Sequence, residues 1–159
     1  MALSLRTFLE TGLLGGVALG MLRATVAELL GPPDELGGTS RRHPQPAIWR
    51  YGGLELHYAT TNQELWLIHG RAERFDRPGR LELDRWILTA ELRREDAERA
   101  LAGAGIQFTL RASGPDPFTL TDELRTAAGV SLLFSSAPDA AESDRLLEVI
   151  TARRPPPSS

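Results

Sequence analysis

Three runs of alternating apolar and polar residues, the first two joined by a pair of glycines, constrain the fold more than any other feature of this sequence. Residues 46–51, 54–59 and 64–70 each have the two-residue period of a half-buried strand. Gly52 and Gly53, between the first two runs, can adopt the positive backbone φ angles that a two-residue hairpin turn requires. The sequence therefore predicts three consecutive antiparallel strands.

The hairpin turn also determines which side chains share a face of these strands. Tyr51 and Leu54 flank the turn and should pair, and alternate residues on either side of them then point the same way. The predicted core face consists of Trp49, Tyr51, Leu54, Leu56, Tyr58, Leu65, Leu67 and His69. The opposite face is then formed by Ile48, Arg50, Glu55, His57, Trp66 and Ile68.

Short helices are predicted before these strands and again after them. Ser4 is a typical N-cap residue, and apolar residues with helical spacing follow it. Gly31, which two prolines follow, should end a second helix, and residues 93–102 should form a third. Further strands are predicted at residues 81–88, 107–112, 118–127 and 130–136. We therefore expect an α+β fold, with short helices packed on one face of an antiparallel sheet.

The two halves of the chain follow a similar plan. Gly31 and Gly105, and likewise Gly53 and Gly129, lie about 75 residues apart, as in an internal repeat. Other chains with a helix before a strand meander would also show some of these matches. The predicted organisation is a helix-plus-three-strand repeat at residues 1–79, a related repeat in the same sheet at residues 80–152, and a disordered tail at residues 153–159.

The predicted repeat bears on one ambiguous segment near the C-terminus. Residues 145–152 fit the period of a helix and that of a strand. Their likeness to residues 63–71, which are predicted to form a strand, favours the strand.

A short motif resembles that of a known family. The sequence has GM at residues 20–21 and LLGPPD at residues 29–34, a pattern similar to the signature of the SmpA/OmlA-type domain of small bacterial outer-membrane lipoproteins. β-Lactamase inhibitory protein is similar in fold, with two tandem copies. The resemblance implies helices packed on an antiparallel sheet whose bare face binds a partner protein. This chain lacks the anchoring cysteine of the lipoproteins, and the motif carries over no residue for partner contact.

Composition excludes several kinds of site. The chain has no cysteine, which rules out disulfides, cysteine nucleophiles and iron–sulfur clusters. The formal net charge is −3, so we do not expect nucleic-acid binding. The 18 basic residues are all arginine. Two loops carry Arg41, Arg42, Arg71, Arg74, Arg77 and Arg80, which we interpret as solvated charges.

The three histidines do not predict a metal site. His57 and His69 are expected on opposite faces of the sheet, and His43 lies in a polar loop. A shared metal ion needs its ligands within a few ångströms of one another. We therefore expect no metal and no other cofactor.

An apolar run near the N-terminus bears on location. Residues 13–22, LLGGVALGML, follow Arg6 and could imitate a signal peptide. The run follows Glu10, contains three glycines and is shorter than a membrane span. We expect a cytoplasmic protein without a membrane-spanning segment, with secretion as the alternative.

The residues opposite the predicted core face suggest a function. Ile48, Arg50, Glu55, His57, Trp66 and Ile68 combine an aromatic, an arginine and aliphatic side chains, as protein-binding surfaces often do. We expect a non-enzymatic module that inhibits or neutralises a partner protein, such as an immunity protein that binds a toxin or an enzyme. One alternative is a structural subunit that self-assembles as a homo-oligomer. Another is a small hydrolase in which Glu55 orients His57 as a general base, although no G-x-S-x-G motif supplies a nucleophile.

Overall fold

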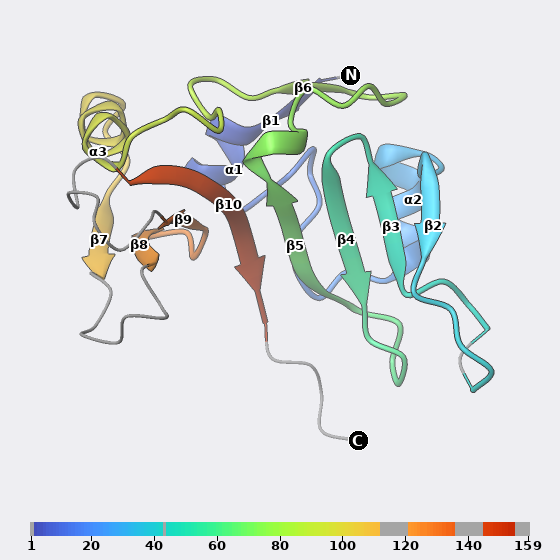
Figure 1. The fold of residues 1–159 in the computed structure, drawn as a ribbon. Helices are drawn as coiled ribbons and strands as arrows, with labels where there is room; N and C mark the ends of the chain where they lie inside the picture. The colour runs from blue at the N-terminus through green and yellow to red at the C-terminus, as the bar shows by residue number, and fades with distance from the viewer. Residues whose placement is uncertain (1, 43, 112–120, 136–144, 155–159) are drawn as a thin grey trace.

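The computed structural model describes residues 2–42, 44–111, 121–135 and 145–154 (Figure 1). The helices are α1 (Leu5–Thr11), α2 (Arg23–Leu30) and α3 (Arg94–Gly103), with a 3-10 turn, η1 (Ala72–Arg74). The strands are β1 (Ala2–Ser4), β2 (Glu35–Gly37), β3 (Ile48–Tyr51), β4 (Leu54–Tyr58), β5 (Leu65–Arg71), β6 (Glu82–Asp84), β7 (Phe108–Arg111), β8 (Thr121–Thr126), β9 (Ser131–Ser135) and β10 (Leu146–Arg153). The predicted α+β fold class is confirmed.

Within the described residues, eight strands form one antiparallel sheet in the order β2-β3-β4-β5-β10-β9-β8-β7. The strands of each half form a meander, and the two meanders join where β5 pairs with β10. Read inward from one edge the strands are β2, β3, β4 and β5, and read inward from the other they are β7, β8, β9 and β10, so each half contributes its strands in chain order. Two copies of one helix–meander unit would give this order, although the duplication and its boundaries stay predictions. β1 and β6 form a small parallel pair outside the large sheet.

A β-bulge occurs at the same place in both meanders. The pairing of β5 with β4 skips Trp66, and the pairing of β10 with β9 skips Glu148. A bulge places one extra residue in a strand and re-aims the side chains beside it. The bulge is therefore part of the plan that the two halves share.

Local signals set both ends of α1 and the turn of the first hairpin, and the N-cap at Ser4 is as predicted. The Ser4 hydroxyl oxygen accepts a hydrogen bond from the Thr7 backbone N–H at 3.1 Å, which caps the helix. The helix ends at Gly12, whose φ of 77° is accessible to glycine at little cost. Gly52 has a φ of 58° in the turn between β3 and β4, which explains the glycine at that position. Gly53 does not have the positive φ that was predicted for it.

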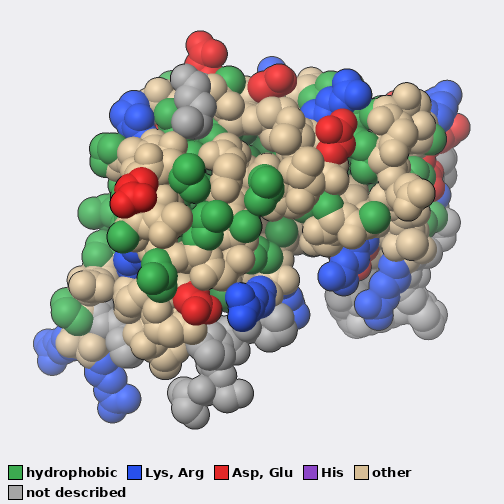
Figure 2. Space-filling model, turned by 180° about the vertical axis from the view of Figure 1, so that it is seen from behind, with side chains coloured by type: hydrophobic (Ala, Val, Ile, Leu, Met, Phe, Trp, Pro, Cys, Tyr) green, Lys and Arg blue, Asp and Glu red, His purple; other side chains and the backbone are tan. Residues whose placement is uncertain are grey.

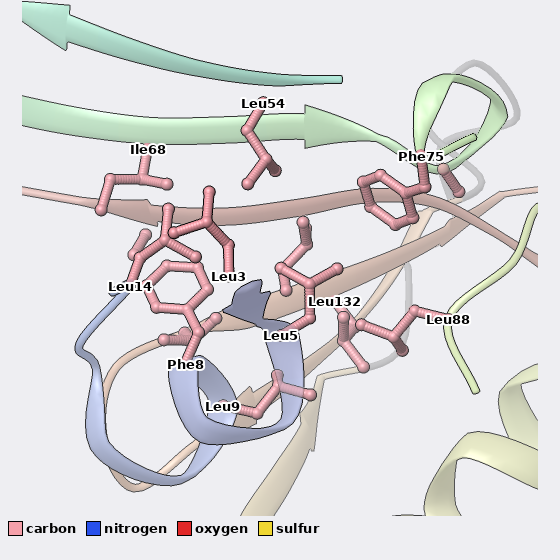
Figure 3. Close-up of a cluster of buried hydrophobic side chains, with 14 of the residues drawn as sticks. Leu3, Leu5, Phe8, Leu9, Leu14, Leu54, Ile68, Phe75, Leu88 and Leu132 are labelled. Atoms are coloured by element: carbon pink, nitrogen blue, oxygen red, sulfur yellow. The ribbon is translucent and has the colours of Figure 1, made fainter. Parts of the chain in front are cut away.

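The core lies between the sheet and the N-terminal segment that contains α1. Figure 1 shows α2 behind β3 of the first meander and α1 behind the upper part of β10, near the junction of the two meanders. Figure 3 shows Phe8 and Leu9 of α1 directed toward the strands, with Leu132 of β9 in the same cluster. All three side chains have no exposed surface. Because β9 belongs to the second half, both halves contribute to one hydrophobic core.

A buried ion-pair network attaches α3 to the second meander. Asp122 of β8 is fully buried and accepts hydrogen bonds from two guanidinium groups, those of Arg94 and Arg145. The bond from Arg94 Nη1 is 2.8 Å long. Arg94 lies at the start of α3, and its bond to Asp122 therefore fixes this end of the helix against β8.

The surface on the helix side carries no concentrated charge. Figure 2 shows hydrophobic side chains scattered among polar groups, with arginines and acidic residues mainly toward the edges. Leu13, Leu22 and Leu29 are each more than a third exposed. Single exposed leucines are common in folded proteins. On this side Arg23 of α2 lies over the rings of Trp49 and Tyr58, with its guanidinium carbon 5.9 Å and 4.6 Å from the ring centroids.

Some predicted boundaries were wrong. Residues 81–88 form only the short β6, because the chain turns at Trp86, whose φ is 55°. β2 was not predicted, and Arg153, predicted to lie in the tail, ends β10. The tail residues 155–159 lie outside the described residues. The ambiguous segment near the C-terminus is a strand, β10, as its likeness to β5 suggested.

Candidate functional site

The candidate site lies on the open face, which we define as the surface of the sheet opposite α1 and α2. Figure 1 is viewed toward this face, and no described helix or strand lies over β3, β4 or the middle of β5. Side chains from these three strands are therefore available to a partner. The central ones form the open-face cluster: Arg50, Glu55, His57, Trp66 and His69.

The bulge in β5 corrects the predicted faces of that strand. Leu56 pairs with Ile68, so Ile68 lies on the core face, where it has no exposed surface. Figure 3 shows it among the buried side chains. His57 pairs with Leu67, and Glu55 with His69, so both of these β5 residues lie on the open face. The prediction was therefore wrong for Ile68, Leu67 and His69, because simple alternation does not allow for the extra residue in the bulge.

The other predicted site residues do lie together. Ile48 and Arg50 lie opposite His57 and Glu55, respectively, in the pairing of β3 with β4. Trp66 projects from the bulge toward His57, with ring centroids 6.1 Å apart and an angle of 71° between the ring planes. This edge-to-face arrangement is a favourable one for aromatic pairs.

The Glu55 carboxylate is the centre of the cluster. Its Oε2 lies 3.4 Å from Arg50 Nε, and its Oε1 lies 3.6 Å from His57 Nε2. His69 lies directly opposite Glu55 on β5. The side chains of Arg50, Glu55 and His57 are between 20% and 29% exposed. One half-buried carboxylate thus holds a guanidinium and lies beside two imidazoles.

Both imidazoles are disposed to be neutral at pH 7. Burial is the main cause that lowers the pKa of His57 below 6.5, and the Glu55 carboxylate opposes this effect. Burial likewise lowers the pKa of His69, with Glu55 opposing and Arg71 adding to the effect. His57 Nε2 is buried and has no hydrogen-bond partner among the described residues.

The geometry offers little to a hydrolase. A general base must hydrogen-bond the group that it deprotonates, and no hydroxyl group of the described residues bonds to His57 Nε2. His57 and His69 lie on the same face, contrary to the prediction that they lie on opposite faces. The described residues nevertheless contain no group of three or more potential metal ligands. His43 lies outside the described residues.

Comparisons with models of protein families, with curated proteins and with solved structures find no match. The resemblance to the SmpA/OmlA-type domain therefore stays a prediction that rests on the motif at residues 20–34. None of the helices in the described parts of the chain is long and apolar enough to cross a membrane.

Proposed function

We propose that this chain is a non-enzymatic module that binds a partner protein through the open face and thereby inhibits or neutralises it. The observation that carries the proposal is the open-face cluster, in which Arg50 and His57 lie beside the Glu55 carboxylate and Trp66 packs against His57. Tryptophan and arginine are the residue types most enriched among those that dominate binding energy. The expected partner is a toxin or an enzyme, as for a bacterial immunity protein.

The packing of the cluster favours binding. Its charged side chains are already largely desolvated and paired in the free protein. A partner that covers them would therefore restrict few additional rotamers, which lowers the entropic cost of association. Ile48 and Leu67 lie on the same face and add apolar area beside the cluster.

Affinity capture from a lysate of the source organism, read by mass spectrometry, tests the proposal. The bait is compared with Trp66→Ala and with a matched control, Trp86→Ala. Trp86 lies in the turn after β6 and stacks against Arg6, with the guanidinium carbon 5.4 Å from the ring centroid. A stoichiometric partner should be captured by the wild type and by the Trp86 variant but not by the Trp66 variant.

The purified partner then allows a quantitative test. Trp66→Ala should weaken its Kd by at least about tenfold, the effect of a dominant interface residue. Circular dichroism must show that the variant is folded. Unchanged affinity for a folded Trp66 variant would refute this placement of the binding surface.

Self-assembly is a second candidate, favoured by the two ends of the sheet. β2 and β7 each pair on one side only within the described residues, and they carry Leu36 and Leu110, which are 58% and 42% exposed. Beside β7 lies an open hollow of about 640 Å³ whose lining includes Ile106 and Phe108. Such edges can pair with another chain. Light scattering separates the candidates, since a monomer at all concentrations contradicts assembly.

A further inference from the structure

A second feature of the open face is a small pocket at the tip of the β3–β4 hairpin. Its volume is about 30 Å³, and its lining contains Arg50, Arg71, Arg74, Arg77, Glu55 and His69. The arginines come from three separate parts of the chain: β3, the end of β5, and the segment that follows it. This volume is about that of one water molecule in the liquid, so the pocket admits a single small polar group.

The glycines of the hairpin explain how the pocket forms. A Cβ atom on Gly53 would lie 2.1 Å from the carbonyl oxygen of Arg74, and one on Gly52 would lie 3.2 Å from that of Arg77. The backbone that carries these two arginines therefore lies directly on the hairpin turn. Only residues without a side chain permit so close an approach.

Asp34 fixes the hairpin to the loop that carries the arginines. Its Oδ2 accepts a hydrogen bond from the Gly52 N–H at 2.7 Å, and its Oδ1 accepts one from the Arg80 N–H at 2.9 Å. The Arg80 guanidinium in turn donates to the carbonyl oxygens of Leu30 and Pro32 at the end of α2. Arg80 therefore has a structural role, unlike the arginines that line the pocket.

The charges around the pocket do not balance. Arg50 lies 3.4 Å from Glu55, and Arg71 lies 3.6 Å from Glu73. Arg74 and Arg77 have no carboxylate within ion-pair distance among the described residues. The residues that line the pocket thus include four arginines and a single acidic residue, Glu55. Guanidinium groups in this arrangement match the oxygens of carboxylates and phosphates.

We propose that this pocket is a binding site for one oxyanion, a carboxylate or a phosphate, with Arg74 and Arg77 as its principal ligands. One oxygen of the anion occupies the pocket, and the rest of the anion lies at its mouth on the open face. The pocket shares Arg50, Glu55 and His69 with the open-face cluster, so an acidic group of a bound partner can also reach it. Binding of a free anion does not depend on the proposed function.

An NMR titration of the full chain tests the site. Inorganic phosphate and, separately, acetate are added at constant ionic strength, and the amide signals of Gly52 and Gly53 and the Nε–Hε signals of the arginines are followed. At least one of the two anions should cause saturable shifts confined to the hairpin and the pocket arginines. A response to phosphate alone identifies a phosphate site, whereas a response to acetate shows that a carboxylate suffices.

Paired arginine variants supply the control. Arg74→Gln and Arg77→Gln should each weaken the Kd by about tenfold, because each removes a charge-assisted hydrogen bond. Arg41→Gln and Arg42→Gln remove the same charge from another exposed loop and should leave the Kd unchanged. Absence of saturable shifts with both anions, or equal effects of the two pairs of variants, would overturn the proposal. Neither result would affect the Trp66 test of partner binding.

The same variants distinguish the source of the anion. If Arg74→Gln and Arg77→Gln also weaken capture of a partner that depends on Trp66, then the oxyanion in the complex belongs to the partner. If capture is unchanged while the titration is positive, the site binds a free anion.

Discussion

Substitution of two neighbouring residues in β5 provides a sharp test of the structure. Ile68 is fully buried on the core face, whereas Leu67 lies on the open face opposite His57. Ile68→Ala removes three buried carbons, worth about 2.4 kcal/mol at about 0.8 kcal/mol each. The residual cavity adds to this loss. We therefore expect Ile68→Ala to lower the free energy of unfolding by about 3–4 kcal/mol, within the range measured for such substitutions.

Leu67→Ala removes the same number of carbons from a partly exposed site. No closed cavity forms there, so the loss should be about 1 kcal/mol. Urea unfolding followed by circular dichroism measures both effects. With a slope of about 2 kcal/mol per molar urea, the unfolding midpoint of the Ile68 variant should lie about 1.5–2 M below that of the wild type. If Leu67→Ala lowers the free energy of unfolding more than Ile68→Ala does, then the bulge at Trp66 and the assignment of Leu67 to the open face are wrong.

Three further effects follow from the packing and the charges. Gly53→Ala should lower the free energy of unfolding by about 1–3 kcal/mol, because the new Cβ would overlap the Arg74 carbonyl oxygen. Gly103→Ala has no atom within 4 Å of its new Cβ and should raise the free energy of unfolding by up to about 1 kcal/mol. Urea unfolding measures both effects. Burial lowers the pKa of both His57 and His69, so the unfolded chain binds more protons below pH 6.5. Stability should therefore fall as the pH falls from 7.5 to 5.5, and a variant with both histidines replaced by glutamine should lose less. Asp122→Asn should lower the melting temperature and cost about 3–5 kcal/mol, because it removes the buried negative charge to which both Arg94 and Arg145 donate hydrogen bonds. An effect below about 1 kcal/mol would contradict the buried network.

The elements that sequence predicted well are those with local causes. Ser4 caps α1 through its own hydroxyl group, and Gly52 supplies the positive φ of the turn between β3 and β4. The turn fixes the register of β3 against β4, and the pairing of Arg50 with Glu55 follows from that register. For these reasons the fold class, the first hairpin and most of the candidate site could be predicted from the sequence.

The features that sequence missed depend on contacts between distant residues. The run Leu65 to Ile68 is apolar throughout, so alternation gives no sign that Trp66 is the extra residue of a bulge. The arginines at 74 and 77 looked like solvated loop charges. They converge with Arg50 only because their backbone lies on the hairpin glycines, which is a matter of tertiary packing.

Comparison of the two meanders separates residues needed for the fold from those available for function. Positions are equated through the two bulges and the cross-strand pairs. Equivalent buried pairs are Leu56 and Leu132, Tyr58 and Phe134, Leu65 and Leu147, and Ile68 and Ile150. Equivalent pairs on the open face or at the bulges are Glu55 and Ser131, His57 and Leu133, Trp66 and Glu148, and His69 and Thr151. The buried positions keep their apolar character, whereas these four open-face or bulge positions change their chemistry. Two other open-face positions keep theirs, since Arg50 corresponds to Arg125 and Leu67 to Val149.

This contrast implies that the open-face cluster is not required for folding. A variant that carries Glu55→Ser, His57→Leu, Trp66→Glu and His69→Thr takes its residues from equivalent positions of the same sheet. Because every replacement already occupies such a position, urea unfolding should show a loss of no more than about 2 kcal/mol, while partner capture should be abolished. An unfolded variant would show that the cluster stabilises the sheet, and a folded variant that retains its partner would place the binding surface elsewhere. Loss of binding with the fold intact would assign the open face of the first meander to recognition.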